Sequence, residues 1–220
     1  MPTQDNVFLK EGDRWFKRNQ GIEDQFVTKE LIKYLSRGKI KPKNILDIGC
    51  SFGFTLGKIQ EIFTKAKLNG LEPSKEAIAY GKKVNSSIKF NKGLAHDLSM
   101  YKDNEFDLVI VSFVFHWIDR SMLLKSVGEI DRILSDKGNL IIQDFDPDIV
   151  SKVKYHHLPK KNVFTFKQKY WDMFLESKIY NKIFSKELSF NNPNRSKGNN
   201  RYQLMVLEKD LEKNYKEVKL

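Results

Sequence analysis

The chain has 220 residues, of which 40% are hydrophobic and 30% are charged, a length and composition typical of one globular domain. It contains a single cysteine, Cys50, so an internal disulfide is excluded. No apolar run approaches the roughly 20 residues that a membrane-spanning helix needs, and the first residues lack the apolar core of a secretion signal. We therefore expect a cytoplasmic protein without membrane insertion.

The formal net charge of +11 is concentrated in the last third of the chain. Residues 151–220 contain 16 Lys and Arg against 7 Asp and Glu. This excess is compatible with an anionic small substrate, with nucleic acid, or with compositional drift. Only 7 of the 39 basic residues are arginine, whose planar side chain binds phosphate in a bidentate manner, so nucleic-acid binding is the weaker interpretation.

Residues 1–43 are expected to form a helical N-terminal segment. Val27, Leu31 and Tyr34 share one face of a helix that ends near Gly38. From residue 44 onward, short apolar strands alternate with amphipathic helices. Strands are predicted at residues 44–48, 67–72, 87–93, 106–115 and 140–145, and helices at 53–64, 121–134 and 74–84, the last with Ser74 as its N-cap.

This alternation predicts a doubly wound α/β fold with a parallel sheet and helices on both faces. After Pro147 the alternation stops. We expect a long loop or small insertion there, a helix over 167–177, and closing strands at 183–190 and 202–209 joined by the turn-rich residues 191–200. The chain is thus divided at 1–43, 44–147 and 148–220, with the last part completing the same domain. Ligands of such folds bind beyond the carboxyl ends of the strands.

The stretch ILDIGCSFG, residues 45–53, joins the first predicted strand to a helix. Gly49, Gly53 and Gly57 are spaced four apart, which does not match the G-x-G-x-x-G fingerprint of nicotinamide enzymes. Asp47 precedes the loop, and its carboxylate would repel a pyrophosphate but attract a cofactor with a positive amino group. Ser51 stands where a further glycine is expected, and it fits most easily with a negative φ.

At this point the chain resembles the class I S-adenosylmethionine-dependent methyltransferases, over residues 44–147. LDIGCSFG is similar to their first motif, and LNGLEPS carries Glu72 at the end of the second strand. GLAHDLSMYKDNEFDLVIVSF and EIDRILSDKGNLIIQDF resemble the segments that follow. The resemblance implies a Rossmann-like, seven-stranded sheet, mostly parallel with an antiparallel last strand. It also implies S-adenosyl-L-methionine as the cofactor and an N-terminal helical lid over it.

The resemblance also assigns cofactor contacts residue by residue. Glu72 is expected at the ribose hydroxyls, and Arg18 of the N-terminal EGDRWFKRN at the methionine carboxylate. Adenine contact is assigned to residues 95–97, although the chain has Leu94 where the family often has an acid. The expected set is Asp47, Gly49, Cys50, Ser51, Gly53, Glu72, Pro73, Ala95, His96, Asp97, Ser112 and Arg18.

Methyl transfer requires alignment of the acceptor and removal of its proton, and histidine is the natural base for a hydroxyl. His116 follows the fourth predicted strand, and His156 and His157 lie in the segment after the fifth. These three are the catalytic candidates. The alternatives are a packed histidine at a helix start and a solvated loop. We expect no metal, because Asp144, Asp146 and Asp148 fit turn formation better than a metal site.

The leading hypothesis is a methyltransferase that modifies a small anionic acceptor on oxygen. EGDRWFKRN and YHHLPKK resemble segments of bacterial enzymes that modify capsule or surface polysaccharides, which suggests a nucleotide-linked sugar or another phosphorylated precursor. Two alternatives stay open: an RNA methyltransferase that docks through the basic last third, and an inactive cofactor-binding module. The sequence does not specify the oligomeric state.

Overall fold

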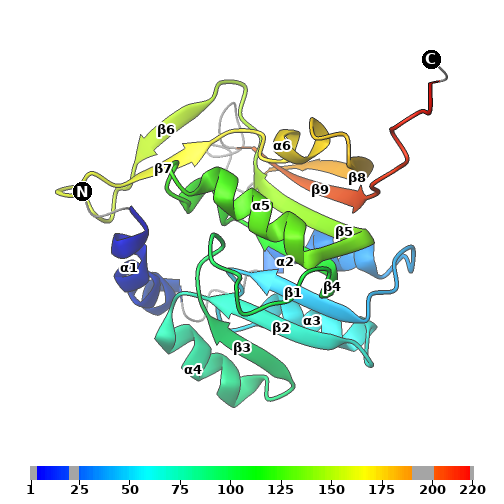
Figure 1. Cartoon of the computed structure of the whole chain (residues 1–220). Helices are drawn as coiled ribbons and strands as arrows, with labels where there is room; N and C mark the ends of the chain where they lie inside the picture. The colour runs from blue at the N-terminus through cyan, green and yellow to red at the C-terminus, as the bar shows by residue number, and fades with distance from the viewer. Residues whose placement is uncertain (1–3, 20–24, 190–200, 219–220) are drawn as a thin grey trace.

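The computed structural model describes residues 4–19, 25–189 and 201–218 (Figure 1). Two helices open the chain, α1 (Gln4–Asn19) and α2 (Gln25–Leu35). They are followed by β1 (Asn44–Ile48), α3 (Phe54–Ile62), β2 (Lys67–Glu72), α4 (Lys75–Val84), β3 (Ile88–Lys92), β4 (Phe106–Ser112), the 3-10 helix η1 (Phe115–Trp117), α5 (Leu123–Ile133), β5 (Leu134–Phe145), β6 (Ser151–Lys154), β7 (Phe164–Lys167), α6 (Asp172–Leu175), β8 (Tyr180–Leu188) and β9 (Tyr202–Lys209).

Seven of the strands form one sheet in the order β3-β2-β1-β4-β5-β9-β8. Strands β1 to β5 pair in parallel, whereas β9 runs antiparallel to both of its neighbours, β5 and β8. The order reverses between β1 and β4, which is where a doubly wound sheet forms its ligand crevice. The expected seven-stranded, mostly parallel sheet with an antiparallel last strand is confirmed.

Helices cover both faces of this sheet and create two apolar cores. Successive strand residues point to opposite faces, so Ile45 and Leu46 of β1 belong to different clusters. Ile45 packs in the cluster that contains Leu31 of α2, together with residues of α3 and α4. Leu46 packs in the cluster that contains Ile130 of α5 and Phe174 of α6. The strands between these layers are almost fully buried, which explains their continuous apolar sequences.

The start of α4 confirms the predicted N-cap. Ser74 has an extended backbone, and its Oγ accepts a hydrogen bond from the Ala77 N–H at 3.0 Å. The same hydroxyl donates to Asp13 of α1 at 2.6 Å, and Asp13 also accepts from the Glu76 N–H at 3.1 Å. The N-terminal helix is therefore tied to the core of the sheet domain through the beginning of α4.

Several predicted boundaries were wrong. The fourth strand ends at Ser112 and not at residue 115, because Phe113 has a φ of 54° and the chain turns into η1. Conversely, β5 begins at Leu134 and incorporates the predicted turn over residues 135–139. The helix near Gly38 ends three residues earlier, at Leu35.

The segment after Pro147 differs most from expectation. The predicted loop contains a two-stranded antiparallel hairpin, β6–β7, in which Ser151 pairs with Lys167. The helix expected over 167–177 shrinks to α6, because Tyr170 and Phe174 bury their rings against the α5 side of the sheet. The predicted linker 191–200 lies outside the described residues. Within the described ranges, no helix is long and apolar enough to cross a membrane.

Candidate active site

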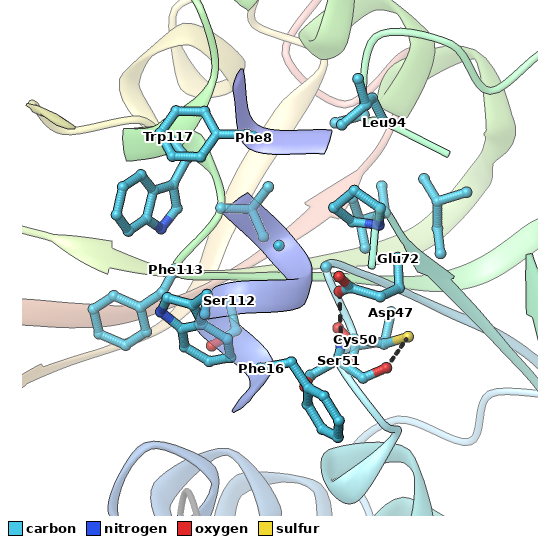
Figure 2. Close-up of a pocket in the computed structure, with 18 of the residues that line it drawn as sticks. Phe8, Phe16, Asp47, Cys50, Ser51, Glu72, Leu94, Ser112, Phe113 and Trp117 are labelled. Atoms are coloured by element: carbon cyan, nitrogen blue, oxygen red, sulfur yellow. Dashed lines mark hydrogen bonds between the residues drawn. The ribbon is translucent and has the colours of Figure 1, made fainter. Parts of the chain in front are cut away.

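A cavity of about 260 Å³ lies at the carboxyl ends of the central strands (Figure 2). Asp47 is the penultimate residue of β1, Glu72 ends β2 and Ser112 ends β4, and all three line the cavity. One face of α1 forms another wall, with residues at the three- and four-residue spacing of a helix face: Phe8, Glu11, Gly12, Trp15, Phe16 and Asn19. The N-terminal helix therefore encloses the crevice of the doubly wound sheet.

The loop between β1 and α3 is held close to neighbouring side chains by two glycines. Gly49 has a φ of 75°, and a Cβ at this position would lie 2.4 Å from Val114 Cγ2. Gly53 has a φ of 81°, and a Cβ there would lie 2.8 Å from the Phe90 ring. Side chains larger than hydrogen therefore do not fit at either position. Such a loop presents bare backbone to a ligand.

Ser51, in the middle of this loop, has a φ of 51°. The expectation of a negative φ was therefore wrong. In this left-handed conformation the Ser51 N–H donates a hydrogen bond to Glu72 Oε2 at 2.9 Å, which Figure 2 shows as a dashed line. The conformation strains a residue that has a Cβ, and the hydrogen bond to a carboxylate offsets part of that strain.

Glu72 is fixed by two backbone amides. Its Oε1 accepts from the Ser74 N–H at 2.8 Å, and its Oε2 accepts from the Ser51 N–H. The side chain is buried, and this burial raises the pKa of Glu72 to about 7 even though both N–H groups lower it. The two backbone amides fix the orientation of the carboxylate. Each of its oxygens keeps a further lone pair that can accept a hydrogen bond from a ligand hydroxyl.

Asp47 is the second buried acid of the cavity. Burial is the main reason that its pKa rises to about 8, and the charge of Glu72 raises it further. Two adjacent acids whose charged forms lack compensation favour a ligand that brings positive charge and hydrogen-bond donors. S-adenosylmethionine has a positive sulfur, an ammonium group and ribose hydroxyls. The glycine loop and the two acids therefore fit this cofactor.

An aromatic wall, formed by Phe8, Trp117 and Tyr155, closes the other side of the cavity. The ring centroids of Phe8 and Trp117 lie 4.8 Å apart, as do those of Trp117 and Tyr155. Phe8 and Trp117 lie next to each other, edge to face, at the upper left of Figure 2. Gln4 connects the same segments, because its Nε2 donates to the carbonyls of Trp117 and Phe164. Segments from α1, η1 and the β6–β7 hairpin thus meet at one point.

A polar cluster beside this wall joins two buried residues, Glu11 and Tyr155, to the exposed Arg18 near the end of α1. Arg18 Nη2 donates to Glu11 Oε1 and, at 2.8 Å, to Tyr155 Oη, and Tyr155 in turn donates to Glu11 Oε1 at 3.1 Å. Burial and the Glu11 charge raise the pKa of Tyr155 to about 12. Glu11 and Tyr155 line the cavity, whereas Arg18 reaches it only through them.

Nine residues of the expected cofactor set line the cavity: Asp47, Gly49, Cys50, Ser51, Glu72, Pro73, Ala95, His96 and Ser112. Three others do not. Gly53 is the N-cap of α3, and Arg18 is bound to Glu11. Asp97 is exposed and accepts a hydrogen bond from the Ser99 hydroxyl at 2.8 Å, while Leu94 lines the cavity in its vicinity.

None of the three candidate catalytic histidines lines the cavity. His116 is buried, with its Nδ1 3.0 Å from Asp144 Oδ1 and its backbone N–H 3.4 Å from Asp144 Oδ2. His156 and His157 are exposed, and their rings are tilted at 43° to each other with centroids 3.9 Å apart. Slight burial and the nearby Arg18 lower the pKa of His157. Their catalytic role stays a prediction.

The acids that were weighed against a metal site have other partners. Asp144 binds His116, and Arg201 Nη2 donates to Asp148 Oδ1 at 2.7 Å. Arg201 Nε also lies 3.6 Å from Asp146. Within the described residues, no group of three His, Cys, Asp or Glu side chains is placed to hold a metal ion.

Sequence reasoning did not anticipate Phe8, Glu11 and Trp117 as wall residues. The available signal was the pattern of α1 itself, in which Phe8, Glu11 and Trp15 recur on one helix face. The pattern does not say which surface that face covers. That information comes only from contacts with η1 and the β6–β7 hairpin, which are more than 100 residues away in the chain.

Comparison with known proteins agrees with this geometry. Residues 46–142 match a family model described as "Methyltransferase domain". The malonyl-[acyl-carrier protein] O-methyltransferase of Halalkalibacterium halodurans is 27% identical over 115 residues, which cover 50% of this chain and 42% of the relative. The chain thus spans less than half the length of this curated relative.

Solved structures share the fold. A structure of S-adenosylmethionine-dependent methyltransferases from Methanosarcina mazei matches with a TM-score of 0.66 and 14% identity, covering 81% of this chain and 98% of that one. The Burkholderia thailandensis 1,6-didemethyltoxoflavin-N1-methyltransferase, with bound 1,6-didemethyltoxoflavin and S-adenosylhomocysteine, matches with a TM-score of 0.72 and 12% identity, covering 96% and 91%. Residues 46–142 therefore match the methyltransferase-domain family, and the chain has the fold of solved S-adenosylmethionine-dependent methyltransferases.

Proposed function

We propose that this chain transfers a methyl group from S-adenosylmethionine to a small acceptor bound against the aromatic wall. The observation that carries this proposal is that one cavity contains both groups of residues. Asp47 and Glu72 lie at the strand ends, and Phe8, Trp117 and Tyr155 lie on the opposite side of the same space. A cofactor and a compact acceptor held there would be shielded from bulk water.

The cofactor, when bound, supplies an activated methyl group on a positively charged sulfur. The backbone of Gly49 and Ser51 would lie against the methionine part of the cofactor. Glu72 would accept hydrogen bonds from the ribose hydroxyls, and Asp47 would lie near the positive charge of the cofactor. Ala95 and Leu94 would contact the base. The contribution of the chain is to align two reactants and exclude water, which is the main source of catalysis for an in-line displacement.

We propose oxygen as the methylated atom. The name of the Halalkalibacterium relative, and that of a relative from Legionella pneumophila that is 27% identical over 127 residues, both specify O-methylation of a malonyl group on an acyl carrier protein. The Burkholderia structure is named for methylation of a ring nitrogen. At sequence identities of 27% or less, these names support methyl transfer as the reaction more strongly than they support any particular acceptor.

The charges of the cavity bear on the expected anionic acceptor. Among the described residues that line it, three are acids (Glu11, Asp47 and Glu72) and none is Lys or Arg. A phosphate inside this space would face like charges. We therefore place the reacting part of the acceptor in the cavity as an uncharged or donor-bearing group, with any anionic part, as in a nucleotide-linked sugar, outside it. The phosphates of an RNA acceptor would meet the same repulsion.

Calorimetry tests the proposal. Wild-type protein should bind S-adenosylmethionine and S-adenosylhomocysteine, and Glu72→Ala should weaken both. Glu61→Gln on α3 is an exposed control that should leave binding unchanged, because the Glu61 carboxylate pairs with Lys58 on the helix surface. Incubation with methyl-labelled cofactor and a fractionated small-molecule extract should then label a small product. No binding of either cofactor form at millimolar concentration would exclude the proposed activity.

A further inference from the structure

Glu11 is the most unusual group of the cavity. Its side chain is 2% exposed, and it lies on α1 beside the aromatic wall. Its Oε1 accepts hydrogen bonds from Arg18 and Tyr155, but its Oε2 is buried and has no hydrogen-bond partner among the residues that the structure describes. Arg14 Nη1 lies 3.9 Å from this oxygen, beyond hydrogen-bond distance, and the Arg14 side chain is 65% exposed. Buried acceptors without a donor are rare and require an explanation.

The cluster around Glu11 fixes the orientation of its carboxylate. The Arg18 guanidinium compensates one oxygen, and Tyr155 holds the same oxygen from the side of the β6–β7 hairpin. A carboxylate oxygen only accepts hydrogen bonds. The missing partner of Oε2 must therefore be an N–H or O–H donor.

From this arrangement we infer that Glu11 recognises the acceptor, and that the acceptor carries an amine or hydroxyl donor next to an apolar or aromatic body. The inference rests on the proposed function, since it concerns the same cavity. Glu11 belongs to the acceptor side because it shares Tyr155 with the aromatic wall, and Tyr155 contacts Trp117. The two acids assigned to the cofactor belong to β1 and β2.

The wall also fits an amine or hydroxyl compound better than a carboxylate or phosphate. Phe8, Trp117 and Tyr155 offer ring faces and edges to an apolar body, and aromatic faces attract cations. Glu11 would repel an anionic group at the same place. Glu11 thus determines specificity through charge, and the wall determines it through shape.

The test uses three probes of similar size: phenethylamine, phenethyl alcohol and hydrocinnamate. Protein saturated with S-adenosylhomocysteine should bind the amine and the alcohol at least about tenfold more tightly than the acid, by calorimetry. Glu11→Gln replaces the free oxygen by an NH₂ group, so it should abolish this preference and improve binding of hydrocinnamate. Glu61→Gln, far from the cavity on an exposed face of α3, is the matched control and should bind like wild type.

The outcomes separate the two proposals. Failure of wild type to bind S-adenosylhomocysteine contradicts the proposed function. Normal binding of S-adenosylhomocysteine with equal affinity for all probes, with preference for hydrocinnamate, or with no probe binding contradicts only the role of Glu11. A loss of S-adenosylhomocysteine affinity in Glu11→Gln would assign Glu11 to the cofactor and also overturn the inference.

Discussion

The backbone N–H of Ser51 donates to Glu72 Oε2 at 2.9 Å and thereby ties the loop after β1 to the end of β2. This bond explains why a residue with a Cβ adopts a φ of 51° in the cofactor loop. The acid that is expected to hold the ribose is oriented by the same loop that is expected to receive the rest of the cofactor. Loop and acid therefore act as one unit, and a change in either should affect both stability and cofactor affinity.

Replacing Glu72 should reveal this double role. Glu72→Ala removes the acceptor of two backbone amides, those of Ser51 and Ser74, and each unpaired buried amide costs about 1–3 kcal/mol. We expect a lower free energy of unfolding and a loss of S-adenosylhomocysteine affinity. Glu72→Gln keeps a single acceptor oxygen. Its free energy of unfolding and its S-adenosylhomocysteine affinity should both lie between those of wild type and Glu72→Ala. Denaturant titration and calorimetry measure the two effects, and a variant that loses neither would contradict them.

Substitutions of Ser51 should separate backbone strain from side-chain chemistry. Ser51→Gly stabilises the folded protein, because the left-handed conformation costs a residue with a Cβ about 1–2 kcal/mol. It also stabilises the unfolded chain, because glycine raises its conformational entropy by an amount worth up to about 1 kcal/mol. We expect stability between neutral and slightly raised, with cofactor affinity retained. Ser51→Val places a β-branched residue in the same conformation and should destabilise the protein and weaken binding. Equal stability of the two variants would show that the loop relaxes on substitution.

The acids of the cavity should make the unliganded protein less stable as the pH rises. The folded-state pKa values of Asp47 and Glu72, about 8 and about 7, exceed the ordinary values of 3.8 and 4.5. Between about pH 4 and pH 8 the folded protein holds protons that the unfolded chain has lost, so the free energy of unfolding falls with rising pH across this window and levels off above it. Thermal unfolding from pH 5 to 9 measures the slope.

Asp47→Asn is the control for this pH dependence. An amide does not titrate, so the slope in the variant should be smaller than in wild type by the part that Asp47 contributes. Saturating S-adenosylmethionine should also reduce the slope, because its positive charge favours the ionised acids. A wild-type stability that increases from pH 5 to pH 8 would mean that both acids are already compensated in the folded protein.

The ends of β1 and β2 could be predicted from sequence because they depend on local patterns. The apolar sequence of residues 45–48, the glycines that follow and Glu72 at the end of the next strand each specify their own surroundings. Nine of the residues expected to contact the cofactor line the cavity. The positive φ of Ser51 was missed because it depends on a hydrogen bond to Glu72, which the loop sequence alone does not contain.

The acceptor side could not be predicted in the same way. Its wall combines α1, η1 and Tyr155, which are separated by about half of the chain. The sequence suggested that His116 faces the reaction because it follows the fourth strand. In the structure, η1 turns the imidazole toward Asp144 of β5 instead. Tertiary contacts decide where a side chain points after a strand ends, and the position of the residue in the chain does not reveal this direction.

The His116–Asp144 pair should stabilise the turn that presents Trp117 to the cavity. Both side chains are buried, and Asp144 Oδ1 also accepts from the Phe145 N–H at 2.8 Å. His116→Ala and Asp144→Ala should each lower the free energy of unfolding by about 1–3 kcal/mol. The two losses in free energy of unfolding, added together, should exceed the loss in the double variant by about 0.5–3 kcal/mol. The reason is that either single substitution already breaks the His116–Asp144 interaction.

Affinity and turnover complete this test. S-adenosylhomocysteine binding should change little in His116→Ala, because His116 does not line the cavity, whereas methyl transfer to any identified acceptor should slow. His156→Ala, an exposed replacement on the hairpin loop, is the matched control and should stay within about 0.5 kcal/mol of wild type. Additive losses in the double-mutant cycle would show that His116 and Asp144 do not act as a pair. An unchanged rate in His116→Ala would remove His116 from the reaction, and His156, His157 and the acids lining the cavity would then be the remaining candidates for proton removal.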